Sequence, residues 1–128
     1  MRDDIYIESV VVLQIHWYLK SYWGGWPPSR ANLDWTDIAN RAWTKAFEPN
    51  PQWLTWQRHP PELEETLARR TSTLDATIQI YALFMVTVRG RPELLGAEVE
   101  RLKQNFQRFL AMPAGRVHKA EIDENPLP

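Results

Sequence analysis

The sequence predicts an all-α fold: a single-domain bundle of four or five helices around a buried central helix at about residues 72–89. Two observations lead to this prediction. Residues 72–88, STLDATIQIYALFMVTV, are apolar on every side when drawn as a helix, and such a helix needs neighbours on all sides. Apolar residues recur at spacings of three and four both before and after this segment, which indicates helices that can serve as those neighbours. A chain of 128 residues is long enough to bury one core.

The central segment has its own start and stop signals. Ser72 stands three residues before Asp75, as in a helix cap, and Gly90 followed by Pro92 marks the end. A β-strand is the competing interpretation, because residues of high strand propensity are frequent between 78 and 88 and periodicity alone does not separate the two structures in a short apolar run. The length of the segment and its caps favour a helix. The main apolar stripe of this helix consists of Leu74, Ile78, Tyr81, Met85 and Val88.

Two helices are expected in the first part of the chain, up to about residue 47. The first spans residues 4–23, and the second begins at a cap on Asn32 or Asp34 and runs to about Phe47. Between them, residues 21–29, SYWGGWPPS, form the clearest loop in the chain. Two glycines remove restraint on the backbone there, and two prolines impose an extended exit.

A short helix over residues 62–70 is expected directly before the central segment, and residues 52–58 are predicted to form one further turn. Pro61 suits the first position of the short helix, because proline has a fixed φ angle and lacks an N–H that would stay unbonded there. The apolar positions of the short helix keep the phase of the central stripe. We therefore expect a kink at residues 71–73 that joins the two helices.

The last helix is expected from Pro92 to about Ala111. It follows a short turn at residues 89–91, and a connection this short makes the last two helices antiparallel neighbours. Residues 113–128 differ in composition, with proline, glycine and an acidic run, and are expected to form a disordered tail. The predicted organisation is a helical domain at 1–112 followed by a flexible tail at 113–128.

Charge and composition exclude several classes of protein. The formal net charge of −1 is nearly balanced, so no global field indicates a nucleic-acid or membrane partner. Cysteine is absent, which excludes disulfides and thiolate sites and is compatible with a reducing compartment. Asp3 and Asp4 stand where a secretory signal needs positive charge, and Asp75 and Gln79 interrupt an apolar run that is shorter than the roughly 20 residues of a membrane span. We expect a cytoplasmic protein with no membrane contact.

Catalytic motifs are not apparent, so no catalytic residue, metal ligand or cofactor is assigned. His16, His59 and His118 are far apart and belong to no metal-binding or catalytic pattern. Glu62 and Glu65 lie one helical turn apart, as paired Mg²⁺ ligands do in all-α nucleotide hydrolases, but no second acidic pair with this spacing follows. A metal-dependent nucleotide hydrolase is therefore only a weak alternative to a non-enzymatic protein.

Tryptophan and arginine are in excess, and both are enriched at the energetic centres of protein interfaces. All seven tryptophans lie between Trp17 and Trp56, and arginine outnumbers lysine 11 to 4. The leading hypothesis is therefore a non-enzymatic protein–protein interaction or assembly protein, meaning a small subunit, adaptor or inhibitor of a larger complex. The expected partner-binding residues are Tyr22, Trp23 and Trp26, which lie in the predicted loop at residues 21–29. Burial of tryptophan in the core is the simpler explanation for part of the excess.

A second hypothesis concerns the last helix. Residues 101–120 contain five basic residues and no acidic one, and Arg101, Lys103 and Arg108 are candidate contacts to phosphates. The alternative function is therefore a nucleic-acid-binding protein or a small helical subunit of a nucleoprotein complex. Self-association into a homo-oligomer is compatible with both hypotheses, because a small chain with many apolar helix faces often associates with itself.

Overall fold

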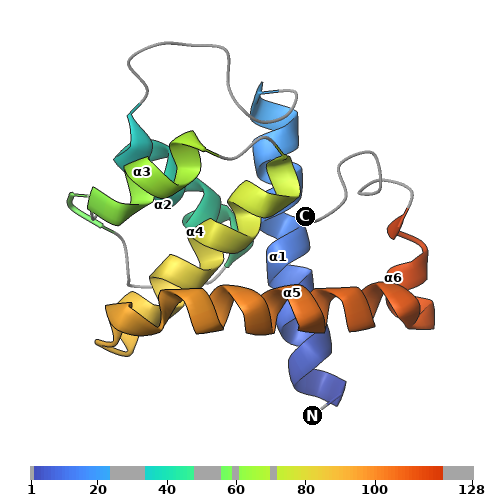
Figure 1. Ribbon diagram of the computed structural model, residues 1–128. Coiled ribbons are helices and arrows are strands. Elements are labelled where there is room, and N and C mark those ends of the chain that lie inside the picture. The colour runs from blue at the N-terminus through green and yellow to red at the C-terminus, as the bar shows by residue number, and fades with distance from the viewer. Residues whose placement is uncertain (1, 24–33, 48–55, 59–60, 70–71, 120–128) are drawn as a thin grey trace.

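The computed structural model describes residues 2–23, 34–47, 56–58, 61–69 and 72–119 (Figure 1). Within these ranges the chain forms α-helices and one 3₁₀ turn and no strand, so the predicted all-α class is confirmed. The elements are α1 (Arg2–Trp23), α2 (Trp35–Ala46), α3 (Pro61–Ala68), α4 (Thr73–Val88), η1 (Pro92–Leu94), α5 (Leu95–Ala111) and α6 (Pro113–Arg116). The described residues thus contain six α-helices, more than the four or five expected, because α6 lies in the predicted tail.

Helix α4 is the buried centre of the fold. Thirteen of its 16 residues are buried, and it contacts α1, α2, α3 and α5. The Ser72 hydroxyl accepts a hydrogen bond from the backbone N–H of Asp75 at 3.0 Å, which caps the first turn. At the other end Gly90 has a φ of 68°, and the N–H of Arg91 donates to the carbonyl of Val86 at 2.9 Å, as in a Schellman motif. The strand alternative for this segment is therefore wrong.

The helices α3 and α4 are separate, so the kink expected at residues 71–73 is not what the structure has. Helix α3 begins at Pro61, as predicted, and ends at Ala68. Ser72 has an extended backbone (φ −117°, ψ 146°), which its capping hydrogen bond requires. A residue in that conformation cannot continue a helix, so the cap of α4 imposes a break.

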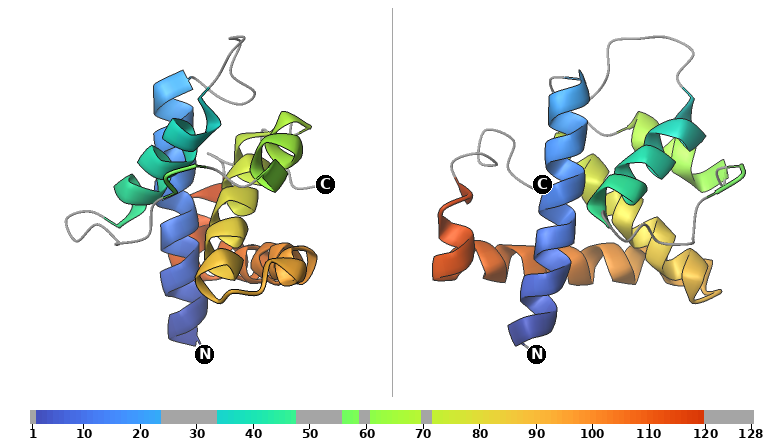
Figure 2. Two further views of the ribbon diagram at one scale, coloured as in Figure 1. Left: turned by 90° about the vertical axis from the view of Figure 1, so that its left-hand side faces the viewer. Right: turned by 180° about the vertical axis from the view of Figure 1, so that it is seen from behind.

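The long helices cross one another at steep angles. In Figure 1 and in the right view of Figure 2, α1 stands upright and α5 lies across it, with α2 beside the upper half of α1. Helices α4 and α5 are neighbours, as expected from the short turn, but α5 runs back obliquely. The end of α1 that carries the N-terminus projects past α5, so the first turns of α1 have the fewest helical neighbours.

Residues 113–119 depart from the expected disordered tail. They include α6, which packs against the end of α5. Gly115 is buried there, and a Cβ atom on it would lie only 2.0 Å from the carbonyl oxygen of Phe109. Glycine is therefore needed for this close approach. Residues 120–128 of the predicted tail lie outside the described residues.

An aromatic stack joins α2, α4 and the segment that precedes α3. The ring of Phe84 lies between two indoles, with ring centroids 3.8 Å from Trp56 and 4.2 Å from Trp43, and interplanar angles of 8° and 21°. All three side chains are buried. Trp56 begins the part of the turn predicted at 52–58 that the structure describes, and residues 56–58 are not helical. These two tryptophans therefore serve the core, as the simpler explanation of the tryptophan excess requires.

The backbone of Trp56 is held by one side chain of α2. The amide of Asn40 donates to the carbonyl of Trp56 at 2.5 Å and accepts from its N–H at 2.8 Å. This pair of bonds satisfies both backbone groups of a buried residue that belongs to no helix or strand. Asn40 therefore holds the backbone of Trp56 in the position from which its ring stacks on Phe84.

Replacing Asn40 with alanine is expected to lower the free energy of unfolding by about 2 kcal/mol, because two hydrogen bonds are lost and the partly buried backbone groups of Trp56 are left without partners. Asn40→Asp keeps the acceptor but loses the donor, so it should fall between the wild type and alanine. Urea unfolding followed by circular dichroism measures both effects. Equal stability of the alanine variant and the wild type would contradict the role given to Asn40.

Candidate functional site

The predicted partner-binding residues lie at the end of α1 and beyond it. The Tyr22 side chain is 57% exposed and stacks on Tyr18, with ring centroids 5.8 Å apart and an interplanar angle of 26°. Trp23 is the last residue of α1, but its side chain lies outside the part that the structure describes, as does all of Trp26. Tyr22 is thus the one residue of this group whose position supports an accessible contact.

Arg101, the first of the predicted phosphate contacts, is bound within the protein. Its two terminal nitrogens donate to the carboxylate oxygens of Glu8 on α1, at 2.7 and 2.8 Å. It also donates twice to Glu98 on its own helix, at 2.7 and 3.1 Å. Arg89, at the end of α4, donates to the same carboxylate of Glu98 at 3.2 Å. This ionic network ties α1, α4 and α5 together.

Contacts within the ionic network shift the pKa of two of its members, Glu98 and Arg101. Glu98 is 5% exposed, and burial alone would raise its pKa. The hydrogen bonds and charges of Arg101 and Arg89 outweigh burial, so the pKa of Glu98 lies below its ordinary value. Bonding to Glu8 and Glu98 raises the pKa of Arg101. Burial, and then the charge of Glu8, raises the pKa of the Tyr81 phenol nearby. Every charge in this network is thus stabilised by another.

The basic face predicted on the last helix is therefore smaller than expected. Arg101 faces α1 and is neutralised by two carboxylates, whereas Lys103 is half-buried and Arg108 is exposed on the same helix. The sequence places Arg101 and Arg108 seven residues apart on one helical face, but it does not show that Glu8, 93 residues away, meets Arg101. Lys103 and Arg108 remain as candidate phosphate contacts.

The residues considered for catalysis do not assemble into a site. Glu62 and Glu65 are both exposed on α3. Within the described ranges, no three His, Cys, Asp or Glu side chains come together in a way that could hold a metal ion. His16 is buried in α1, and the ring of His118 lies edge-on to Trp17 at 5.4 Å, while His59 lies outside the described residues.

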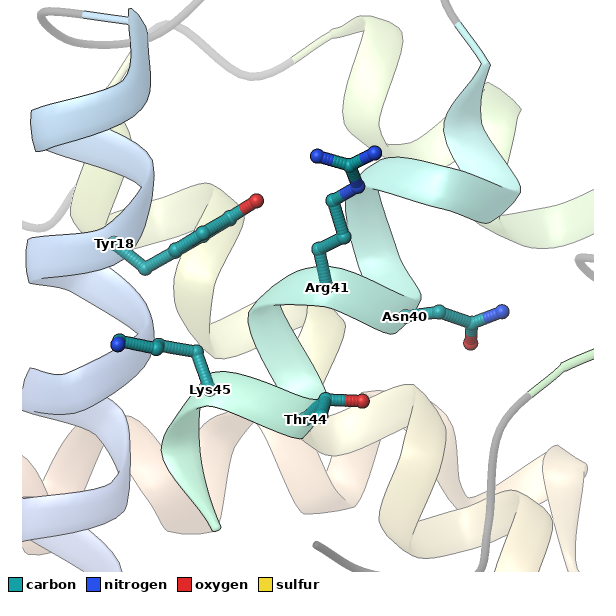
Figure 3. Close-up of a pocket in the computed structure, with 5 residues that line it drawn as sticks. All are labelled: Tyr18, Asn40, Arg41, Thr44 and Lys45. Carbon is teal, nitrogen blue, oxygen red and sulfur yellow. The ribbon is translucent and has the colours of Figure 1, made fainter. Parts of the chain in front are cut away.

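A pocket of about 380 Å³ opens between α1 and α2. It is lined by Tyr18 from α1 and by Asn40, Arg41, Thr44 and Lys45 from α2 (Figure 3). Sequence reasoning missed it. Arg41 and Lys45 are four residues apart, so the sequence does show that they share one face of a helix. Their position beside Tyr18 depends on how α1 packs on α2, which the sequence does not show. A smaller cavity of about 250 Å³ borders the ionic network and is lined by Ile7, Glu8, Arg89 and Arg101.

No family model, curated protein or solved structure matches the chain. Function must therefore be argued from the arrangement of its own residues. None of the helices that the structure describes is long and apolar enough to cross a membrane.

Large apolar side chains remain exposed at the projecting end of α1. Tyr6 is 47% exposed and Ile7 is 59% exposed. Tyr6 lies over the C-terminal half of α5, where its ring meets Phe109 at a centroid distance of 6.0 Å, and Ile7 borders the smaller cavity beside Arg89. The two residues thus flank α5 at its crossing with α1. Val117, 73% exposed, follows α6 on the same half of α5 as Phe109.

Proposed function

We propose that this protein is a non-enzymatic interaction or assembly protein, a small helical subunit or adaptor that binds another protein through the projecting end of α1. The observation that supports the proposal most is the exposure of Tyr6 and Ile7. A tyrosine and an isoleucine that are about half exposed where α1 projects past α5 offer the apolar contact area that interfaces use at their centres. Tyr22 offers a second accessible aromatic contact at the opposite end of the same helix.

The cysteine-free composition suits a cytoplasmic partner, in a reducing compartment. The alternative is a nucleic-acid-binding protein that uses the last helix. It is less favoured, because Arg101 is held by Glu8 and Glu98 and leaves only Lys103 and Arg108 for phosphates.

The experiment compares three forms of the tagged protein purified from its native cell. The wild type is expected to retain a protein partner after nuclease treatment, whereas the Ile7→Lys variant should lose it, because a buried unpaired ammonium group disfavours an apolar contact. Gln107→Lys introduces the same charge at an exposed position of α5 and should retain the partner. Thermal unfolding should show equal stability of all three proteins, since both positions are exposed.

Two outcomes would count against the proposal. Retention of the same partner by Ile7→Lys would remove the projecting end of α1 as the contact. Loss of all partners on nuclease treatment would favour the nucleic-acid alternative. Sedimentation of the purified wild type alone separates self-association from binding to a different protein.

A further inference from the structure

The pocket between α1 and α2 gathers two cationic side chains around a phenol. Figure 3 shows the Tyr18 ring reaching from α1 toward α2, with Arg41 on one side of it and Lys45 on the other. Asn40 and Thr44 also line the pocket, but their side chains point away from Tyr18, and Asn40 binds the backbone of Trp56. The groups that face α1 are therefore a guanidinium, an ammonium and a phenol, all of which can donate hydrogen bonds to an anion.

The acidic residue nearest to this pocket does not cancel its charge. Asp37 accepts a hydrogen bond from Nε of Arg41 at 3.0 Å, and both side chains are about half exposed. A solvent-exposed pair of this kind is weak. It also occupies only one of the five N–H groups of the guanidinium. Lys45 adds a second cationic side chain to the lining of the pocket, four residues after Arg41 on the same helix.

An accessible aromatic ring adjoins the cationic pair. Tyr22 lies one helical turn after Tyr18, stacks on it, and is 57% exposed. Tyr22 therefore lies next to Tyr18, which lines the pocket. Cations beside an exposed aromatic ring are the combination with which proteins bind single nucleotides and single strands: the cations hold the phosphate, and the ring stacks on the base.

We propose that the pocket between α1 and α2 binds a nucleotide unit, whose phosphate is held by Arg41 and Lys45 and whose base stacks on Tyr22. The volume of about 380 Å³ falls within the roughly 300–1,000 Å³ of small-ligand sites. Two sources share this chemistry: a free nucleotide, and a nucleotide within a single strand. Neither requires Tyr6 or Ile7 at the projecting end of α1, so the nucleotide site shares only Tyr22 with the proposed protein contact.

Titrations of the full chain test the proposal and separate the two sources. The probes are a free pyrimidine monophosphate, a short single-stranded oligothymidylate and a duplex of equal length, measured by calorimetry at about 50 mM and again at about 200 mM salt. The wild type is expected to bind the single strand more tightly than the duplex, and more weakly at the higher salt. Binding of the monophosphate with an affinity close to that of the single strand identifies the free nucleotide as the ligand. Binding of the single strand alone identifies a strand.

Three variants assign the binding to this pocket. The double variant Arg41→Gln, Lys45→Gln should weaken binding at least tenfold and reduce the salt dependence, because two phosphate contacts are lost. Tyr22→Ala should weaken binding about tenfold at both salt concentrations, because stacking does not depend on ions. Arg69→Gln is the matched control: Arg69 also belongs to an exposed pair four residues apart, with Glu65 at 3.1 Å, but on α3. It should bind as the wild type does.

Four results would overturn the proposal: no binding of the monophosphate or the single strand at low salt, preference for the duplex, equal weakening by Arg69→Gln, or unchanged binding by Tyr22→Ala. The last result would leave only an unspecific anion contact. Thermal unfolding of each variant shows whether it is folded. The ion pairs of Arg41 and Arg69 are exposed, and the Tyr22 side chain is 57% exposed.

Discussion

Replacing Phe84 with alanine is expected to destabilise the protein by about 3–5 kcal/mol, a large effect for the truncation of one side chain. Phe84 is fully buried in α4, and its ring is stacked between Trp43 and Trp56. Truncation removes both stacking contacts and leaves a cavity that two large rigid indoles cannot easily fill. Since domains of this size are stable by only about 5–15 kcal/mol, the variant should lose a large share of its free energy of unfolding.

The measurement is urea unfolding followed by circular dichroism, with the emission of the tryptophans recorded in parallel. Phe84→Leu is a graded comparison and should lose less, because leucine fills part of the cavity. Val117→Ala is the control: Val117 is 73% exposed, and its truncation should change stability by no more than about 0.5 kcal/mol. A loss below about 1 kcal/mol for Phe84→Ala would contradict the central place given to the aromatic stack.

Replacing Arg101 with methionine is expected to cost about 2–3 kcal/mol at neutral pH, because the buried carboxylate of Glu98 and the half-buried one of Glu8 lose their main partner. Methionine keeps the apolar stem of the side chain. The expected loss is smaller than for a fully buried pair, since the Arg101 side chain is 39% exposed and Arg89 still contacts Glu98.

The dependence on pH should have opposite signs in the two proteins. In the wild type the pKa of Glu98 is lowered in the folded state, so its ionisation stabilises the fold above the ordinary value of 4.5, and this stability is lost as the pH falls through the lowered pKa. In Arg101→Met, burial becomes the dominant effect and raises the pKa of Glu98. Its ionised form then destabilises the fold, and protonation relieves this as the pH falls. The stability gap between the proteins should therefore narrow from about pH 7 to about pH 4.

Two further variants check this account by urea unfolding across the same pH range. Adding Glu98→Gln to Arg101→Met should restore part of the lost stability at neutral pH, because the unpaired buried charge is removed. Arg91→Met breaks the exposed pair with Glu93, in which both side chains are 59% exposed, and should change stability little. A stability gap that is the same at all pH values would show that Arg101 acts through packing and not through its charge.

The start and end of most helices were predictable because the signals that set them are local. Asp34 caps α2 through the N–H of Asp37, three residues on, and Ser72 caps α4 in the same way. Such contacts form between residues that are close along the chain, so the sequence itself contains them. The predicted kink before α4 is absent, because the Ser72 cap needs an extended backbone although the apolar positions of the two helices share one phase.

The candidate sites were less predictable, because they depend on contacts between distant segments. The last helix does carry the basic residues that the sequence indicates. The Arg101 side chain, however, is bound by Glu8, which lies 93 residues earlier in the chain. The pocket between α1 and α2 brings Tyr18 together with Arg41 and Lys45. None of these three was predicted as a site residue from the sequence, which indicated only Tyr22, the neighbour that stacks on Tyr18.

The amino-acid sequence by itself determined the all-α class and the burial of α4, because a helix that is apolar on every side is stable only when other helices surround it. It also determined where α2, α3 and α4 begin, since caps act within one turn. Only the tertiary structure decided which charges are free and which are paired. The crossing of α1 and α5 brings Glu8 to Arg101 and leaves Tyr6 and Ile7 exposed on either side, and no local pattern encodes the angle of that crossing.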